Sequence, residues 1–231
     1  MKILAFDTAT EYCTSALWLD GDAEEQTVRA GQTHSALLLP HCRQLLAGAG
    51  LRLADLDAVA FGRGPGSFTG VRIASAAAQG LALGAGLPVI GISTLLALTR
   101  DEDGDRVLTA LDARMGEIYC AAWVREAGCY QTLIAPVVGD PARLPVPAGD
   151  GWVGCGSGFG VSDGALASRF GDGLRAIDGG RVPSAARIAI LAEAALRDGA
   201  QPAADASLPI YVRDRVARKI SERQHAADDR S

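Results

Sequence analysis

The sequence predicts an α/β protein of two lobes, in which each lobe is a mixed β-sheet with helices on its faces. Short apolar segments rich in β-formers alternate with segments of helical periodicity. This order of strands followed by helices occurs twice, in two halves separated by the polar segment 101–105. A chain of 231 residues, of which 48% are hydrophobic, can form one well-packed domain or two small lobes.

The first half predicts a sheet with helices on its faces. Strands are expected at 2–6, 12–20, 24–30, 56–62 and 87–91. Helices are expected at 33–50, 69–84 and 94–100. In the first helix Leu38, Cys42 and Leu45 share one stripe, and Pro40 is predicted to kink the helix or to mark its first turns.

The second half predicts the same kind of unit. Strands are expected at 106–114, 117–126, 130–138 and 152–158, and helices at 159–170 and 183–199. The last helix has a proline near its start and a glycine at its end. We therefore expect an N-terminal lobe over 1–104, a C-terminal lobe over 105–221 and a disordered polar tail over 222–231.

Composition narrows the classes of function. The formal net charge of −5 argues against direct, charge-driven binding to nucleic acid. Five scattered cysteines favour reduced thiols over a disulfide framework or a zinc site. Glycines, Gln79 and Pro88 interrupt the most apolar stretch, 73–92, so it is a poor membrane span. We expect a soluble cytoplasmic protein with no membrane partner.

A glycine-rich loop, "GRGPGSFTGVR" at 62–72, lies between a predicted strand and a predicted helix. This arrangement can hold phosphate, but the loop lacks the lysine of a P-loop. Ser67 and Thr69 stand where a dinucleotide-binding loop needs glycine. Two interpretations remain. The loop is a turn that lets the helix pack closely, or the backbone amides at the helix start bind an anion.

The segment "DTATE" at 7–11 follows the first strand. Asp7, Thr8 and Thr10 can hold a metal-bound phosphate, or they can cap the backbone of a turn. No other residue pattern in this half favours one choice over the other.

Two groups of polar residues are weaker candidates. Asp112, Arg114 and Glu117 surround a glycine hairpin, where they are either a solvated turn or groups that face a cleft or a partner. His34 and His41 are seven residues apart, about 10 Å along a helix, which is too far to bind one metal ion.

The helix at 69–84 carries small residues on two stripes. One stripe contains Ala74, Ala78 and Ala82, and the other contains Ala76, Gly80 and Gly84. One stripe can pack on the sheet. The second either belongs to the same core or meets another chain.

Several segments together resemble one family. They are "ILAFDTATEYCTSALW", "HSALLLP", "FGRGPGSFTGVRIASAAAQGLALGAGLPVIGISTL", "LDARMGEIY" and "PIYVRDRVARK". The chain thereby resembles the bacterial TsaB family, also called YeaZ or the non-peptidase M22 homologues. The resemblance implies the two-lobed fold of actin, Hsp70 and the sugar kinases (the ASKHA fold).

The resemblance also implies a function. The family forms a non-catalytic subunit of the complex that places the threonylcarbamoyl group on N6 of adenosine 37, in tRNAs that read codons starting with A. In that role it binds and activates the catalytic homologue TsaD, together with the ATPase TsaE.

The resemblance implies that the chain has no catalytic residue, no metal and no intrinsic cofactor. Catalytic relatives carry a His-x-x-x-His metal pair after the strand equivalent to 87–91, and these positions hold Ser93 and Ala97 here. Ala9 replaces a glycine of the fold's phosphate loop, so Asp7, Thr8 and Thr10 are expected to form a degenerate cofactor site. ATP or ADP is expected only at an interface within the complex.

Partners follow from the same resemblance. It implies a heterodimer with TsaD through helices 34–48 and 69–84, a homodimer when the chain is alone, and tRNA contact only through the complex. The expected partner-binding residues are Leu37, Leu38, Cys42, Leu45, Val71, Ala74 and Ala78.

Two other functions compete with this one. The first is a stand-alone ATP-binding phosphotransferase of the ASKHA type, which would use Asp7, Thr8 and Thr10. The second is a glycoprotease, and no nucleophile or zinc pattern supports it.

Overall fold

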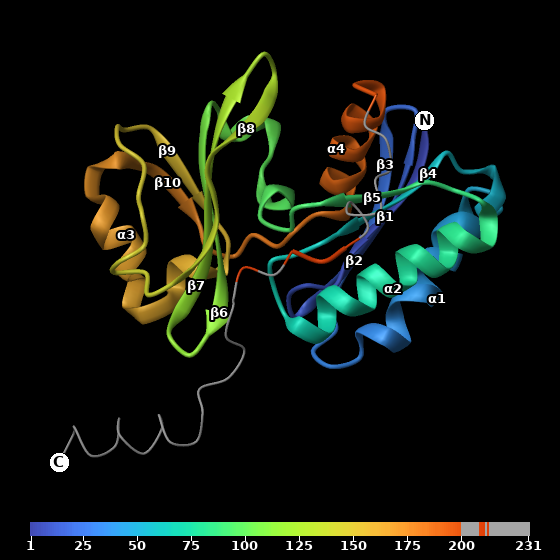
Figure 1. The fold of residues 1–231 in the computed structure, drawn as a ribbon, viewed down its shortest axis with the longest axis horizontal. Helices are drawn as coiled ribbons and strands as arrows, with labels where there is room; N and C mark the ends of the chain where they lie inside the picture. Colours follow the sequence, from blue (N-terminus) through green and yellow to red (C-terminus); the bar gives the residue numbers. More distant parts are fainter. Residues whose placement is uncertain (200–207, 211, 213–231) are drawn as a thin grey trace.

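The computed structural model describes residues 1–199, 208–210 and 212, and within them the chain forms two lobes (Figure 1). The first lobe contains β1 (Lys2–Asp7), β2 (Tyr12–Leu19), β3 (Asp22–Arg29), β4 (Ala58–Gly62) and β5 (Val89–Ile92). The second contains β6 (Arg106–Arg114), β7 (Glu117–Glu126), β8 (Cys129–Gly139), β9 (Trp152–Cys155) and β10 (Leu174–Asp178). The expected tail, 222–231, lies outside the described residues.

The two sheets have the same topology. The first has the order β3-β2-β1-β4-β5 and the second the order β10-β9-β6-β7-β8, which is the same order read backwards. In each, the first three strands pair antiparallel in sequence order. The fourth strand pairs parallel with the first, and the fifth pairs parallel with the fourth. This repeated mixed sheet confirms the predicted two-lobed α/β fold class.

Helices cover both faces of the first sheet. α1 (His34–Gly48) and α2 (Phe68–Ala85) lie on one face, where Leu38, Cys42 and Leu45 of α1 share a core with Phe6 and Phe61. Successive residues of a strand point to opposite faces of the sheet. The residues of β1 that alternate with Phe6 therefore face the opposite side of the sheet, away from α1 and α2. α1 continues through Pro40 without a break.

The other face of the first sheet is covered by α4 (Ala185–Arg197), the last helix within the described residues. Ile188, Ala189 and Ala192 of α4 pack against Ile3 and Ala5 of β1. The expected division placed this helix in the C-terminal lobe, whereas its contacts are with the first sheet. The reason is the apolar stripe of α4, which buries the face that α1 and α2 leave bare.

The second lobe has shorter helical cover, and two predicted helices differ from the structure, one in this lobe and one at the end of the first half. The helix expected at 159–170 is a 3-10 helix, η4 (Ser157–Gly164), and then α3 (Ala165–Phe170), because Ser162 and Asp163 adopt positive φ. The helix expected at 94–100 is only the 3-10 turn η2 (Leu96–Leu98). Strand β10 was not predicted, since the edge segment "LRAID" is short and largely exposed.

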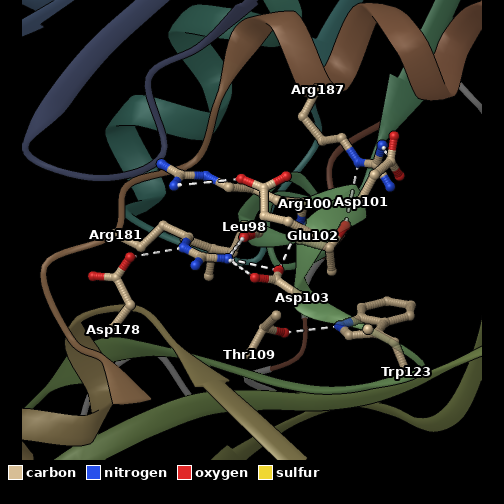
Figure 2. Close-up of polar contacts among 12 residues, drawn as sticks. Leu98, Arg100, Asp101, Glu102, Asp103, Thr109, Trp123, Asp178, Arg181 and Arg187 are labelled. Carbon is tan, nitrogen blue, oxygen red and sulfur yellow. Dashed lines mark hydrogen bonds and ion pairs between the residues drawn. The ribbon is translucent and has the colours of Figure 1, made fainter. Parts of the chain in front are cut away.

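A network of charged residues joins the lobes at the turn η3 (Asp101–Asp103), shown in Figure 2. Arg181 donates to both oxygens of Asp103, at 2.7 and 2.6 Å, and to Asp178 at 3.0 Å. Asp101 accepts from Arg187 of α4 at 3.0 Å and from Arg125 of β7 at 3.2 Å. Because α4 packs on the first sheet and β7 belongs to the second, Asp101 bridges the two lobes.

Candidate functional site

A cleft of about 1000 Å³ lies between the lobes. The first lobe contributes the loop after β1, the glycine loop after β4 and the start of α1; the second contributes the β6–β7 hairpin and the turn 179–183. Ile210 and Val212 also line it, and the Ile210 amide donates to the Arg63 carbonyl at 2.7 Å. A cleft of this size between two lobes is a typical place for a small-molecule site.

The residues of the expected phosphate loop are used mainly inside the protein. Asp7 is fully buried, and its Oδ1 accepts from the Ala9 amide at 2.7 Å while its Oδ2 accepts from the Thr94 hydroxyl at 2.7 Å. The Thr8 hydroxyl donates to the Gly70 carbonyl at 2.7 Å. Of the three expected cofactor residues, only Thr10 lines the cleft.

Burial raises the pKa of the Asp7 carboxyl above its ordinary value. The hydrogen bonds from Ala9 and Thr94, and the charge of His34, oppose this rise in pKa. A buried carboxyl that is already bonded on both oxygens is poorly placed to hold a metal-bound phosphate in the cleft.

The glycine loop explains why the loop after β1 is closed. A Cβ at Gly62 would lie 1.6 Å from Asp7 Oδ2, one at Gly66 would lie 2.4 Å from the Ala9 carbonyl oxygen, and one at Gly70 would lie 1.9 Å from the Thr8 carbonyl oxygen. These three positions need glycine because the two loops touch. Close packing, the first of the two interpretations of this loop, therefore accounts for these glycines.

A second glycine segment, "GCGSG" at 154–158, packs in the same way in the second lobe. A Cβ would lie 2.5 Å from the Phe159 ring at Gly154, 2.3 Å from the Ala110 carbonyl oxygen at Gly156 and 2.7 Å from Ala110 Cβ at Gly158. Its glycines are required by close contacts within the lobe.

Two of the three polar residues predicted around the β6–β7 hairpin line the cleft. Asp112 and Arg114 both line it, and their charged groups lie 3.5 Å apart. The Ser157 hydroxyl accepts from the Asp112 amide at 3.1 Å. Glu117, at the other side of the hairpin, is not among the residues that line the cleft.

The positions that correspond to the metal pair of catalytic relatives are apolar or small. Ser93 is half-buried, and Ala97 packs in the core beside Ile188 of α4. Among the residues that the structure describes, no three of the types His, Cys, Asp and Glu gather where they could hold a metal ion. All five cysteines are free thiols.

The prediction of the partner-binding residues has to be corrected. Six of the seven are buried in the chain's own structure: Leu38, Cys42, Leu45, Val71, Ala74 and Ala78. The seventh, Leu37, is half-buried. Five of the buried residues lie in the core between these helices and the sheet, while Val71 lines the cleft. The side chains of these six are therefore not available on the outward sides of the two helices.

The outward sides of the same helices carry a different apolar surface. Leu39 is 46% exposed and Leu83 87%. Phe68, at the start of α2, is 51% exposed and also lines the cleft. Both helices cover the same face of the first sheet, so their outward sides point the same way (Figure 1). We call this surface the helix-pair face; besides the three large residues it includes the exposed small residues Ala36, Ala76 and Gly80.

Sequence reasoning identified both helices of this surface but not its large residues. Phe68, Ala76 and Leu83 recur at helical spacing on α2, and this spacing could have revealed a second stripe. No helix within the described residues has the length and apolar character needed to cross a membrane.

Comparisons with known proteins identify relatives of this chain in sequence and in structure. The family model described as TsaD, tRNA N6-adenosine threonylcarbamoyltransferase, matches residues 28–150. The Escherichia coli protein named tRNA threonylcarbamoyladenosine biosynthesis protein TsaB is 39% identical, over 95% of this chain and 97% of that protein. The Haemophilus influenzae protein of the same name is 47% identical, over 54% of this chain and 55% of that protein.

A solved structure is also similar over most of the chain. The structure of YeaZ from Pseudomonas aeruginosa superposes with a TM-score of 0.82 at 38% identity, and covers 91% of this chain and 99% of that one.

Proposed function

The chain belongs to the TsaB family, and from this membership we propose that it takes part in the biosynthesis of threonylcarbamoyladenosine in tRNA. The support is the similarity to the Escherichia coli protein of that name over nearly the whole of both chains. The match of the TsaD family model to residues 28–150 supports a role in the same modification.

Within that process, we propose that the chain is a non-catalytic subunit that works in the cytoplasm. The closed loop after β1 supports this, because Asp7 and Thr8 bond within the protein and do not line the cleft. The same closure weakens the alternative, a stand-alone phosphotransferase of the ASKHA type. In our proposal, ATP or ADP binds only at an interface of the complex, and tRNA is contacted only through the complex.

The observation that carries the subunit role is the helix-pair face. Leu39, Phe68 and Leu83 are exposed although the core beneath the two helices is already filled. Exposed apolar surface on one side of a soluble protein commonly marks an interface with another protein. We propose that this face binds TsaD, in a complex with TsaE. In the absence of TsaD, it binds a second copy of the chain, and the two pairings exclude each other.

The experiment that tests this role is the substitution Leu83→Glu. The side chain is almost fully exposed, so the fold should be unchanged in circular dichroism and thermal unfolding. An unpaired carboxylate buried in an interface costs several kcal/mol, so affinity for TsaD should fall roughly a hundredfold or more. The variant should fail to co-elute with TsaD and, when mixed with TsaD and TsaE, should fail to support modification of adenosine 37.

The matched control is Leu133→Glu, which makes the same change at a half-exposed leucine on β8 of the second lobe. It should bind TsaD as the wild type does. Normal TsaD binding by Leu83→Glu would place the interface elsewhere. Ala78 is unsuitable for this test, because it is fully buried and a glutamate there would disrupt the core.

A further inference from the structure

The chain passes between the two lobes twice within residues 1–199. The first crossing, residues 93–105, runs from β5 to β6 and contains the turn η3. The second crossing, residues 179–184, runs from β10 to α4. Two lobes that are joined by short segments commonly rotate about those segments as about a hinge. Rotation of this kind requires that the backbone of both crossings can change its angles.

The two crossings are bonded to each other where they pass (Figure 2). Arg181 of the second crossing donates to both carboxylate oxygens of Asp103 in the first, and to the Leu98 carbonyl at 3.2 Å. The Ser184 amide donates to the Ala97 carbonyl at 3.1 Å. The side chains of Arg181 and Asp103 are 8% and 3% exposed. Moving one crossing without the other would therefore break a buried ion pair, which is costly.

A contact between the lobes themselves lies on the same turn. Tyr130 of β8 is buried, and the Arg187 guanidinium of α4 lies 5.8 Å from the centroid of its ring. A cation within about 6 Å of an aromatic ring is attracted to the ring face. The Tyr130 hydroxyl lies 2.7 Å from the Gly104 carbonyl oxygen and 3.1 Å from that of Arg100, and these two residues flank η3. Tyr130 therefore fixes the first crossing to the second lobe and contacts the helix that covers the first sheet.

The second crossing also forms part of the wall of the cleft. Residues 179–183 line the cleft, and Arg181 among them is the residue that bonds to Asp103. A rotation of the lobes about the crossings would widen or narrow the cleft, and it would pull these two side chains apart. The same ion pair therefore opposes a change in lobe angle and a change in cleft volume.

We propose that these contacts form a lock that holds the two lobes at one relative angle, and so keeps the cleft at one volume. The lock consists of the buried pair Asp103–Arg181 between the crossings and the contact Tyr130–Arg187 between the lobes. Separating the buried pair would leave two charges without a partner in a place that water does not reach, so the open arrangement is disfavoured. The proposal does not rest on the subunit role, since it concerns the isolated chain.

The test measures the distance between the lobes with two spin labels on the full-length chain. Cys129 on β8 is exposed and the other four cysteines are buried, so a thiol reagent should label Cys129 selectively. Glu24→Cys, at an exposed position on β3, supplies the second label in the first lobe. Labelled chain is mixed with an excess of unlabelled chain, so that only distances within one chain are recorded. Double electron–electron resonance should give a single narrow distance distribution with the wild-type junction.

Asp103→Ala removes both acceptors of Arg181, so it should broaden the distribution or move its mean while circular dichroism shows that the lobes stay folded. Leu45→Ala is the matched control. It removes a fully buried side chain from the core of the first lobe, so it should lower stability comparably and leave the distribution narrow. If Asp103→Ala does not fold, Arg181→Lys replaces it. One ammonium cannot contact Asp103, Asp178 and the Leu98 carbonyl together, so this variant should broaden the distribution as well.

Three results would overturn the proposal. They are a broad or two-peaked distribution with the wild-type junction, a distribution in Asp103→Ala or its replacement that equals the wild-type one, and equal broadening in Leu45→Ala. TsaD is absent from all of these samples. A failure here is therefore distinct from a failure of the proposed subunit role.

Discussion

The two lobes share one strand order and differ in the helices that cover it. In the first lobe α1, of 15 residues, joins β3 to β4, and α2, of 18 residues, joins β4 to β5. In the second lobe the segment from β8 to β9 contains no helix, and the segment from β9 to β10 contains only short ones. A short helix only covers its sheet, whereas long helices also present a continuous outward side. The helix-pair face that we propose to bind a partner therefore lies on the first lobe.

The two glycine segments show the same contrast at smaller scale. In the first lobe, Gly66 and Gly70 contact the backbone of Ala9 and Thr8. In the second lobe the segment 154–158 contacts the Ala110 backbone but also side chains. A side chain can move to relieve a clash more readily than backbone can. Among these glycines Gly70 has the closest backbone contact, so it should tolerate substitution least.

The largest expected effect follows from this difference. Gly70→Ala places a methyl group 1.9 Å from the Thr8 carbonyl oxygen, so the two loops must separate. We expect a loss of about 4 kcal/mol or more in the free energy of unfolding, or failure to fold. Urea denaturation followed by circular dichroism measures it.

Gly80→Ala is the matched control in the same helix, because a Cβ at Gly80 meets no atom within 4 Å. It should raise the free energy of unfolding by about 0.5–1 kcal/mol through helix propensity alone. Equal losses in the two variants would show that contact between the loops is not what requires glycine at position 70.

The junction between the lobes gives the second prediction. Asp103→Ala leaves Arg181, whose side chain is almost fully buried, without its bidentate partner. Removing one member of a buried ion pair costs about 3–5 kcal/mol, so urea unfolding should show a loss of that size. A loss below about 1 kcal/mol, the value typical of a solvent-exposed pair, would contradict it.

Asp101→Ala is the comparison for this junction. Asp101 bridges the same two lobes but is mostly solvent-exposed, so its removal should cost about 1 kcal/mol or less. A cost as large as that of Asp103→Ala would show that the bridge, rather than the buried pair, holds the lobes together.

The sequence predicted most strands of both lobes because apolar alternation and turns are local signals. Strands β6 and β7 were placed at 106–114 and 117–126, which are their observed bounds. Two kinds of structural feature could not be predicted from the sequence. α4 was assigned to the wrong sheet neighbour, because an amphipathic stripe shows that a face is buried but not which sheet buries it.

The prediction of which residues of α1 and α2 face outward was wrong for a related reason. Both stripes of α2 contain small residues, so their spacing alone could not show that Ala74 and Ala78 face the sheet. The buried pair of Asp103 and Arg181 and the closure of the loop around Asp7 depend on contacts between residues far apart in the sequence. Such contacts have no local pattern, and only the folded structure reveals them.

The smallest expected effect concerns the closed loop itself. Burial raises the pKa of Asp7 in the folded protein above the ordinary value of 3.8. The unfolded chain therefore releases this proton at lower pH than the folded protein does. Stability that is present below pH 3.8 is lost as pH rises through the interval between the two pKa values.

Asp7→Asn removes this loss, because the amide stays neutral at every pH and its oxygen can still accept from the Ala9 amide. Relative to the wild type, the variant should gain stability as pH rises above 3.8. Asp7→Ala should instead lose about 2 kcal/mol, since the Ala9 amide and the Thr94 hydroxyl then lack their acceptor. Urea unfolding of the three proteins between pH 4 and pH 7 separates these effects. A difference between Asp7→Asn and wild type that does not change with pH would mean that folding does not raise the pKa of Asp7, and it would contradict this prediction.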